Sequence, residues 1–161
     1  MIRPARPADM AQVAAIWNQV IRETAITFTT AEKSEAGLRA TLAEKAAAGQ
    51  GFLVDVAGDT VRGFALYGPF RAGPGYRFTM EHTIHLAEGA RGKGLGRALL
   101  GALEEQARGA GVHSLWAGIS AENPESVGFH ARMGYAEIAR LPEVGHKFGR
   151  WMDLVLMQKR L

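Results

Sequence analysis

A glycine-rich segment that carries three basic side chains is the most informative chemical motif of the chain. Residues 91–97 read RGKGLGR and lie between an expected strand and an expected helix. In this context, backbone N–H groups and the positive end of the helix dipole can receive a phosphate group. The glycines let the backbone come close to a ligand, and the basic side chains add positive charge. The segment predicts a phosphate-binding loop, and a glycine-rich turn with a solvated basic rim is the alternative.

The spacing excludes two well-known phosphate loops. A P-loop needs Ser or Thr directly after the Gly92-Lys93 pair, and Gly94 stands there. A dinucleotide-binding fingerprint that starts at Gly92 needs glycine at position 97, which is Arg97.

The strand that enters this loop carries a carboxylate on its polar face. Residues 78–86 (FTMEHTIHL) alternate, with mainly apolar side chains at even positions and polar ones, including Glu81, at odd positions. A partly desolvated carboxylate has a raised pKa, which suits a general base. A solvated strand glutamate without a chemical role is the alternative.

Composition limits the remaining chemistry. The 161 residues are 47% hydrophobic and 22% charged, which is typical of one globular domain spanning residues 1–161. The absence of Cys excludes disulfides, iron–sulfur clusters, thiolate zinc sites and a cysteine nucleophile. The net charge of +3 does not favour nucleic acid. No apolar stretch reaches the roughly 20 residues of a membrane span, and no signal peptide is evident. We expect a cytoplasmic protein with neither nucleic acid nor membrane as a partner.

Periodicity predicts the elements that position these residues. Helices are expected over about 7–23, 34–49 and 95–110, with another from Asn123 to near Gly134. Strands are expected over about 52–57, 60–67, 78–86, 114–119, 135–142 and 152–159, with a Gly/Pro-rich loop over 68–77. This order indicates a single α/β domain.

Four segments in order resemble one known family. Arg91-x-x-Gly94-x-Gly96 resembles the acyl-CoA pyrophosphate loop of the GNAT acetyltransferases. MEHTIHL before it, and SAENPESVGFHARMGY and PEVGHKFGRWMDLVLMQ after it, resemble the phosphinothricin and methionine sulfoximine N-acetyltransferase subfamily. The resemblance runs from near residue 24 to Gln158. It implies an α/β (α+β) GNAT fold: a central, twisted mixed sheet with helices on both faces, splayed where acetyl-CoA enters.

The resemblance also implies the catalytic groups. Because the chain has no Cys, we expect the amine to attack acetyl-CoA directly. Glu81 matches the subfamily's strand glutamate and is the candidate base. His130 matches a subfamily histidine and is expected to protonate the leaving thiolate or to relay a proton from the amine; a packed helix histidine is the alternative. The other histidines have no metal-ligand spacing, so we expect no metal. His85 departs from the subfamily, which usually has Tyr there.

The residues expected to hold acetyl-CoA follow from the same resemblance. Backbone groups of three strand residues would hold the pantetheine arm, the loop would hold the pyrophosphate, and an asparagine would bond the arm. These residues are Ile84, His85 and Leu86; Arg91, Gly92, Lys93, Gly94, Leu95, Gly96 and Arg97; and Asn123. A helix cap is the alternative role for the asparagine, and both roles can hold together.

The acceptor amine is expected to be a small amino acid, whose carboxylate suits an arginine fork. The candidate substrate-binding residues are three arginines, three aromatic residues that could form apolar walls, and a Pro-Gly pair in the loop before Glu81. They are Phe28, Arg71, Pro74, Gly75, Tyr76, Arg77, Arg150 and Trp151. Surface arginines and core aromatics are the alternatives.

The function expected is transfer of acetyl to the α-amine of methionine sulfoximine, phosphinothricin or methionine sulfone. Another amine acceptor (a polyamine, an aminoglycoside or a peptide N-terminus) and a non-catalytic acyl-CoA-binding domain are the alternatives. Relatives commonly form homodimers, and the apolar segment Leu154 to Met157 could take part in such an interface.

Overall fold

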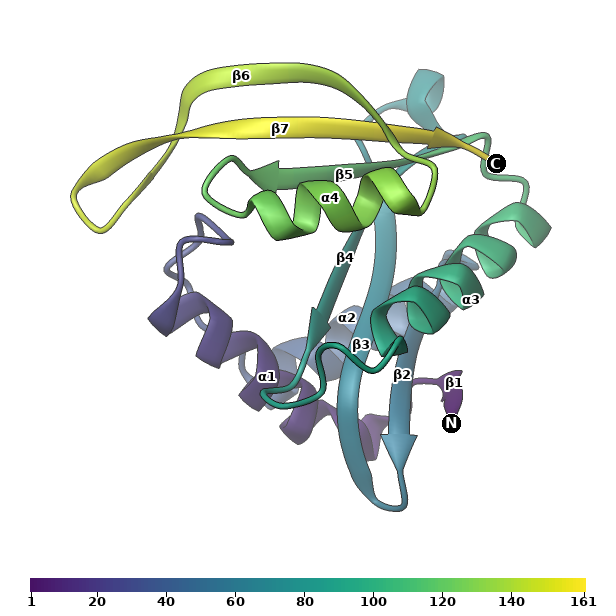
Figure 1. The fold of residues 1–161 in the computed structure, drawn as a ribbon. Helices are drawn as coiled ribbons and strands as arrows, with labels where there is room; N and C mark the ends of the chain where they lie inside the picture. Colours follow the sequence, from purple (N-terminus) through teal and green to yellow (C-terminus); the bar gives the residue numbers. More distant parts are fainter.

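A single seven-stranded sheet with helices on both faces forms the protein (Figure 1). The computed structural model describes residues 1–161. The strands are β1 (Ile2–Pro4), β2 (Phe52–Ala57), β3 (Thr60–Pro69), β4 (Thr79–Leu86), β5 (Ser114–Ser120), β6 (Ala136–Lys147) and β7 (Arg150–Arg160). The helices are α1 (Met10–Glu23), α2 (Glu35–Ala47), α3 (Leu95–Gly109) and α4 (Pro124–Arg132), and short 3-10 turns cover Pro7–Asp9 and Pro74–Tyr76.

The sheet is mixed, and its single parallel pair lies at the centre. The strand order is β1-β2-β3-β4-β5-β7-β6, and every neighbouring pair except β4 with β5 is antiparallel. The parallel pair joins only Thr79–Glu81 to Ser114–Trp116. Beyond Glu81, β4 stays paired with β3 as far as Leu86. Since β5 has left it by then, the two strands diverge, as the predicted splayed GNAT sheet requires.

Two apolar cores hold the faces of the sheet. One packs α3 against the centre of the sheet through fully buried Leu99, Leu100 and Leu103. The other packs α1 and α2 on the opposite face through Met10, Val13 and neighbouring residues of β2 and β3. The amphipathic stripes of α1 and α3 produce this arrangement. On α3 the buried stripe includes Leu100, whereas Ala98 is exposed.

Local signals at the helix starts are confirmed. The Ser34 side chain accepts a hydrogen bond from the Gly37 N–H at the start of α2. The Asn123 side chain accepts one from the Ser126 N–H at the start of α4. Both bonds satisfy N–H groups that have no partner inside the helix.

The C-terminal hairpin is longer than predicted. The expected strands over 135–142 and 152–159 extend to Ala136–Lys147 and Arg150–Arg160. Pro142 and Gly145 break the alternation, and the structure absorbs them in an irregularity between Leu141 and Gly145. A two-residue turn joins the strands, with φ of +53° at Phe148 and +72° at Gly149. Positive φ at both central residues matches a type I′ hairpin turn.

Two further differences lie elsewhere in the sheet. The three-residue strand β1 was not predicted, because it is too short to show a period. Gly68 and Pro69, expected in a loop, pair with Glu81 and Met80 and lengthen β3. No helix combines the length and apolar composition that a membrane span needs.

Candidate functional site

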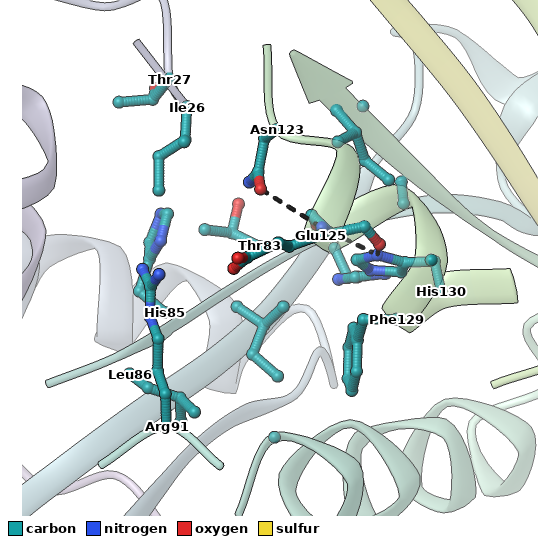
Figure 2. A pocket seen from close by; sticks show the side chains of 18 of the residues that line it. Ile26, Thr27, Thr83, His85, Leu86, Arg91, Asn123, Glu125, Phe129 and His130 are labelled. Atoms are coloured by element: carbon teal, nitrogen blue, oxygen red, sulfur yellow. Dashed lines mark hydrogen bonds between the residues drawn. The ribbon is translucent and has the colours of Figure 1, made fainter. Parts of the chain in front are cut away.

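A cleft of about 850 Å³ opens where β4 and β5 separate (Figure 2). Its walls come from β4, the 91–97 loop, the end of β5, helix α4 and the connection between α1 and α2. The volume is within the range of about 300–1,000 Å³ typical of small-molecule sites. The sequence analysis had placed candidate residues for catalysis or acetyl-CoA binding on β4, on the 91–97 loop and on α4 with its cap Asn123.

Glu81 lies at the vertex of the cleft. It is the last β4 residue paired with β5, opposite Trp116. Its carboxylate crosses toward β5 so closely that a Cβ on Gly118 would lie 2.7 Å from Glu81 Oε1. The carboxylate is open on its cleft side, but the surrounding walls withdraw enough water to raise the pKa of Glu81. A raised pKa moves a carboxylate toward the range of an effective base at neutral pH.

His130 lies at the cleft wall on α4 and is only 2% exposed. Its Nδ1 lies 2.7 Å from the Ser126 carbonyl oxygen, one turn earlier, so Nδ1 carries the proton and donates it there. Nε2 is therefore left as an acceptor, and it has no hydrogen-bond partner. Burial lowers the pKa of His130, opposed in part by the bond to Ser126. The ring is thus neutral near pH 7 and has an unused lone pair.

His82 stacks on His130 from the apolar face of β4. The ring centroids are 5.1 Å apart with an interplanar angle of 24°. Burial, and then the nearby His130, lower the pKa of His82 to about 3. Tyr135 contacts both rings edge-on, with centroids 5.3 Å from His130 and 5.6 Å from His82. The packing fixes the orientation of the His130 ring, and a neutral His82 adds no charge beside it.

His85 of β4 faces the cleft. It packs against Trp17 and Phe64, with ring centroids 5.9 Å and 5.6 Å away. Burial, and then the charge of Arg91, lower the pKa of His85 to about 4. A neutral imidazole at this place widens the cleft relative to tyrosine and supplies no acidic proton near pH 7.

The glycine-rich loop has the backbone that its composition predicted. Gly92 and Gly94 have φ of +77° and +74°, and nothing lies within 4 Å of the place of a Cβ on either. Gly94 is the N-cap of α3, whose first hydrogen bond runs from the Ala98 N–H to the Gly94 carbonyl. The preceding N–H groups of the helix have no helical partner. They point out of the N-terminus of a 15-residue helix and can receive an anion.

Most residues predicted to hold acetyl-CoA line the cleft together. Ile84, His85, Leu86, Arg91, Gly92, Gly94, Leu95, Gly96, Arg97 and Asn123 all border it, whereas the Lys93 side chain does not. Glu81 borders the same space, and so does His130 (Figure 2).

The predicted substrate-binding residues are not brought into the cleft of this chain. None of Phe28, Arg71, Pro74, Gly75, Tyr76, Arg77, Arg150 and Trp151 lines it. Arg150 is paired with Glu122, with Nη2 2.6 Å from Oε1. Trp151 contacts His146 and is 61% exposed. The residues of the 71–77 segment lie before the start of β4, at the end of the strand opposite the glycine-rich loop. Their role in substrate binding stays a prediction.

Sequence reasoning missed the wall that faces the glycine-rich loop. Trp17, Ile26, Thr27, Thr29 and Lys33 border the cleft from α1 and the α1–α2 connection. The connection has no periodicity, and Trp17 fitted the apolar stripe of α1 equally well. Gly118 was missed too, although glycine within a strand is a signal of close approach by another group.

No group of three or more His, Asp or Glu side chains is arranged to hold a metal ion.

Comparisons with known proteins agree with this geometry. The sequence model of the acetyltransferase (GNAT) family matches residues 17–135. An L-methionine sulfoximine/L-methionine sulfone acetyltransferase of Pseudomonas aeruginosa is 40% identical over 162 residues, covering 99% of this chain and 94% of that protein.

Two solved structures share the whole fold. An acetyltransferase of Salmonella typhimurium, solved with its cofactor acetyl-CoA, has a TM-score of 0.97 at 36% identity, covering 100% of this chain and 93% of that one. A phosphinothricin acetyltransferase of Sinorhizobium meliloti in complex with acetyl-CoA has a TM-score of 0.95 at 30% identity, covering 100% and 88%.

Proposed function

Because this chain belongs to the GNAT acetyltransferase family, we propose that it transfers acetyl from acetyl-CoA to the α-amine of a small amino acid analogue. Methionine sulfoximine, methionine sulfone and phosphinothricin are the proposed acceptors, since relatives over nearly the full chain are named for them. The observation that carries the proposal is one cleft that combines the vertex carboxylate of Glu81 with the positive-φ loop of Gly92 and Gly94.

The donor is proposed to lie along the free edge of β4. Residues after Glu81 have no partner on the β5 side, so the backbone of Ile84 to Leu86 is open to the pantetheine amides. The N–H groups at the start of α3, with Arg91 and Arg97 beside them, would hold the pyrophosphate. An N–H of the 84–86 segment would face the acetyl oxygen as negative charge develops on it.

Glu81 is proposed as the base. The amine nitrogen forms a bond to the acetyl carbon, the carbon–sulfur bond breaks, and the amine proton passes to Glu81, directly or through water. The raised pKa of Glu81 strengthens it for this role. The thiolate needs little help, because an ordinary thiol has a pKa of roughly 8.5.

His130 is proposed as a proton acceptor in a relay rather than as the acid. Its Nδ1 proton is engaged by Ser126, and its lowered pKa keeps Nε2 unprotonated near pH 7. Of the two roles predicted for His130, the relay from the amine fits this geometry better than protonation of the thiolate.

The acceptor assignment predicts selective turnover. With acetyl-CoA saturating, release of free CoA thiol is expected with methionine sulfoximine, methionine sulfone and phosphinothricin. It is expected to be at least about tenfold slower in kcat/KM with ordinary amino acids, a polyamine, an aminoglycoside or a short peptide. A thiol reagent measures this without background, because the protein has no Cys. Faster turnover of another amine class would show that the proposed acceptor is wrong. Binding of acetyl-CoA without turnover of any amine would favour the alternative of a non-catalytic acyl-CoA-binding domain.

The loop assignment predicts that Gly94→Trp weakens acetyl-CoA binding by about tenfold or more, because the side chain fills the proposed pyrophosphate cradle. Gly49→Trp is the matched control: Gly49 also has positive φ (+66°) and open space around it, but lies outside the cleft. Calorimetric titration of both variants with acetyl-CoA measures the effect. Equal affinities in the two variants would contradict the assignment.

We also propose a homodimer acting in the cytoplasm, with detoxification of such amino acid analogues as its role. Four large apolar side chains, each more than half exposed, lie on the β6–β7 hairpin: Ile138, Val144, Phe148 and Trp151. Large apolar side chains that stay exposed along one hairpin support an interface there. Sedimentation equilibrium is expected to give twice the chain mass of 17.3 kDa; the mass of one chain at micromolar concentration would contradict the dimer.

A further inference from the structure

Lys147, the last residue of β6, places its ammonium group against the α1–α2 connection. The residue is 2% exposed, and Nζ donates hydrogen bonds to the backbone carbonyls of Thr24 at 2.6 Å and Thr27 at 2.9 Å. The connection leaves α1, which packs on β3 and β4, whereas β6 belongs to the β5-β7-β6 side of the splayed sheet (Figure 1). The two bonds therefore join the two sides of the cleft.

The buried charge has no carboxylate partner. None of the ion pairs of the chain includes Lys147. The face of the Phe148 ring, 4.9 Å from Nζ, is its other neighbour. Burial lowers the pKa of Lys147, as expected for an ammonium removed from water. Burying a charge without a counter-ion is costly, and an apolar side chain of similar volume would fill this space at less cost. The lysine is therefore poorly explained by stability alone.

A second contact reinforces the same junction. The ring of Phe28 lies on Gly145 of β6, where a Cβ would come within 2.4–2.6 Å of three ring carbons. Phe28, predicted as a wall of the substrate site, thus holds the segment in place from outside the cleft. Glycine at position 145 makes room for it.

The segment held in this way forms one wall of the cleft. Ile26 and Thr27 point into it from the side opposite Arg91 and Leu86 (Figure 2). Both ends of the connection are fixed locally: Thr24 bonds the Val20 carbonyl at one end, and the Asn18 side chain bonds the N–H and the carbonyl of Lys33 at the other. Residues 24–28 make hydrogen bonds with the β5-β7-β6 side only through Lys147, whose Nζ donates to the carbonyls of Thr24 and Thr27.

We propose that Lys147 is a positioning residue for the acceptor. By its two hydrogen bonds it holds Ile26 and Thr27 in place as the wall against which the amine substrate binds. The proposal rests on the proposed acetyl transfer, and assigns the donor to the β4 edge and the 91–97 loop. Loss of the tether then raises the KM for the acceptor and leaves the affinity for acetyl-CoA unchanged.

Lys147→Met removes the charge while keeping an unbranched chain of similar length. The KM for methionine sulfoximine is expected to rise about tenfold or more, with a smaller change in kcat, because two charge-assisted hydrogen bonds to the wall are lost. Lys147→Arg, which keeps donors, is expected to restore part of the affinity. Lys45→Met is the matched control: Lys45 is also partly desolvated and bonds Gln50 at 2.9 Å, but lies outside the cleft. Equal acceptor KM values in the Lys147 and Lys45 variants would overturn the proposal.

Gly145→Ala tests the same junction without touching the lysine. The added methyl group displaces Phe28, so the acceptor KM is expected to rise and the acetyl-CoA dissociation constant to stay within about twofold. In both variants amide hydrogen exchange of residues 25–29 is expected to quicken while that of α3 does not. If amide hydrogen exchange of residues 25–29 is unchanged in Lys147→Met, Lys147 does not hold this segment, and the proposal is wrong whether or not an acceptor has been found. If the wild-type protein acetylates none of the amines but hydrogen exchange of residues 25–29 is faster in the variants, the proposed function is wrong and the role of Lys147 in holding the segment stands.

Discussion

The early end of the parallel pairing between β4 and β5 is the constraint on which the site depends. After three residue pairs, β4 continues with β3 alone, and its other edge carries unpaired backbone groups. Such groups cost free energy when they are buried without partners, so they are retained where water or a ligand can bond them. An extended, amide-bearing ligand can take the place of the missing strand. The same divergence leaves the cleft that both Glu81 and His130 border.

Burial without ion-pair partners is the main cause of the shifted pKa values of the titratable groups around this cleft. The raised pKa of Glu81 has desolvation as its cause, and desolvation is also the largest cause of the lowered pKa values of His82, His85 and His130. A neutral histidine and a carboxylate of raised pKa are both proton acceptors near pH 7. With pKa values of about 3 and 4, His82 and His85 are weak bases, whereas the raised pKa of Glu81 makes it the strongest proton acceptor of the three.

The order of helices and strands and the glycine-rich wall of the cleft could be predicted from sequence because their signals are local, whereas the splayed sheet was predicted from the family resemblance. The alternation around Glu81, the stripe of α3 and the glycines of the 91–97 loop each act within one element. The wall formed by the α1–α2 connection could not be predicted in this way. It depends on Lys147 meeting Thr24 and Thr27, more than 100 residues earlier in the chain. The connection that carries these residues has no period, and the type I′ turn after Lys147 contains Phe148, an unusual residue for positive φ.

The dependence of kcat/KM on pH in Glu81→Gln tests most directly whether the vertex of the cleft holds the base. In the wild-type protein, activity needs the carboxylate and falls as the pH drops through the raised pKa of Glu81. The glutamine variant is expected to lose about 100-fold or more near neutral pH. The loss should shrink at high pH, where the amine is already free of its proton. A loss of equal size at every pH, with acetyl-CoA binding intact, would show that Glu81 does not remove the proton.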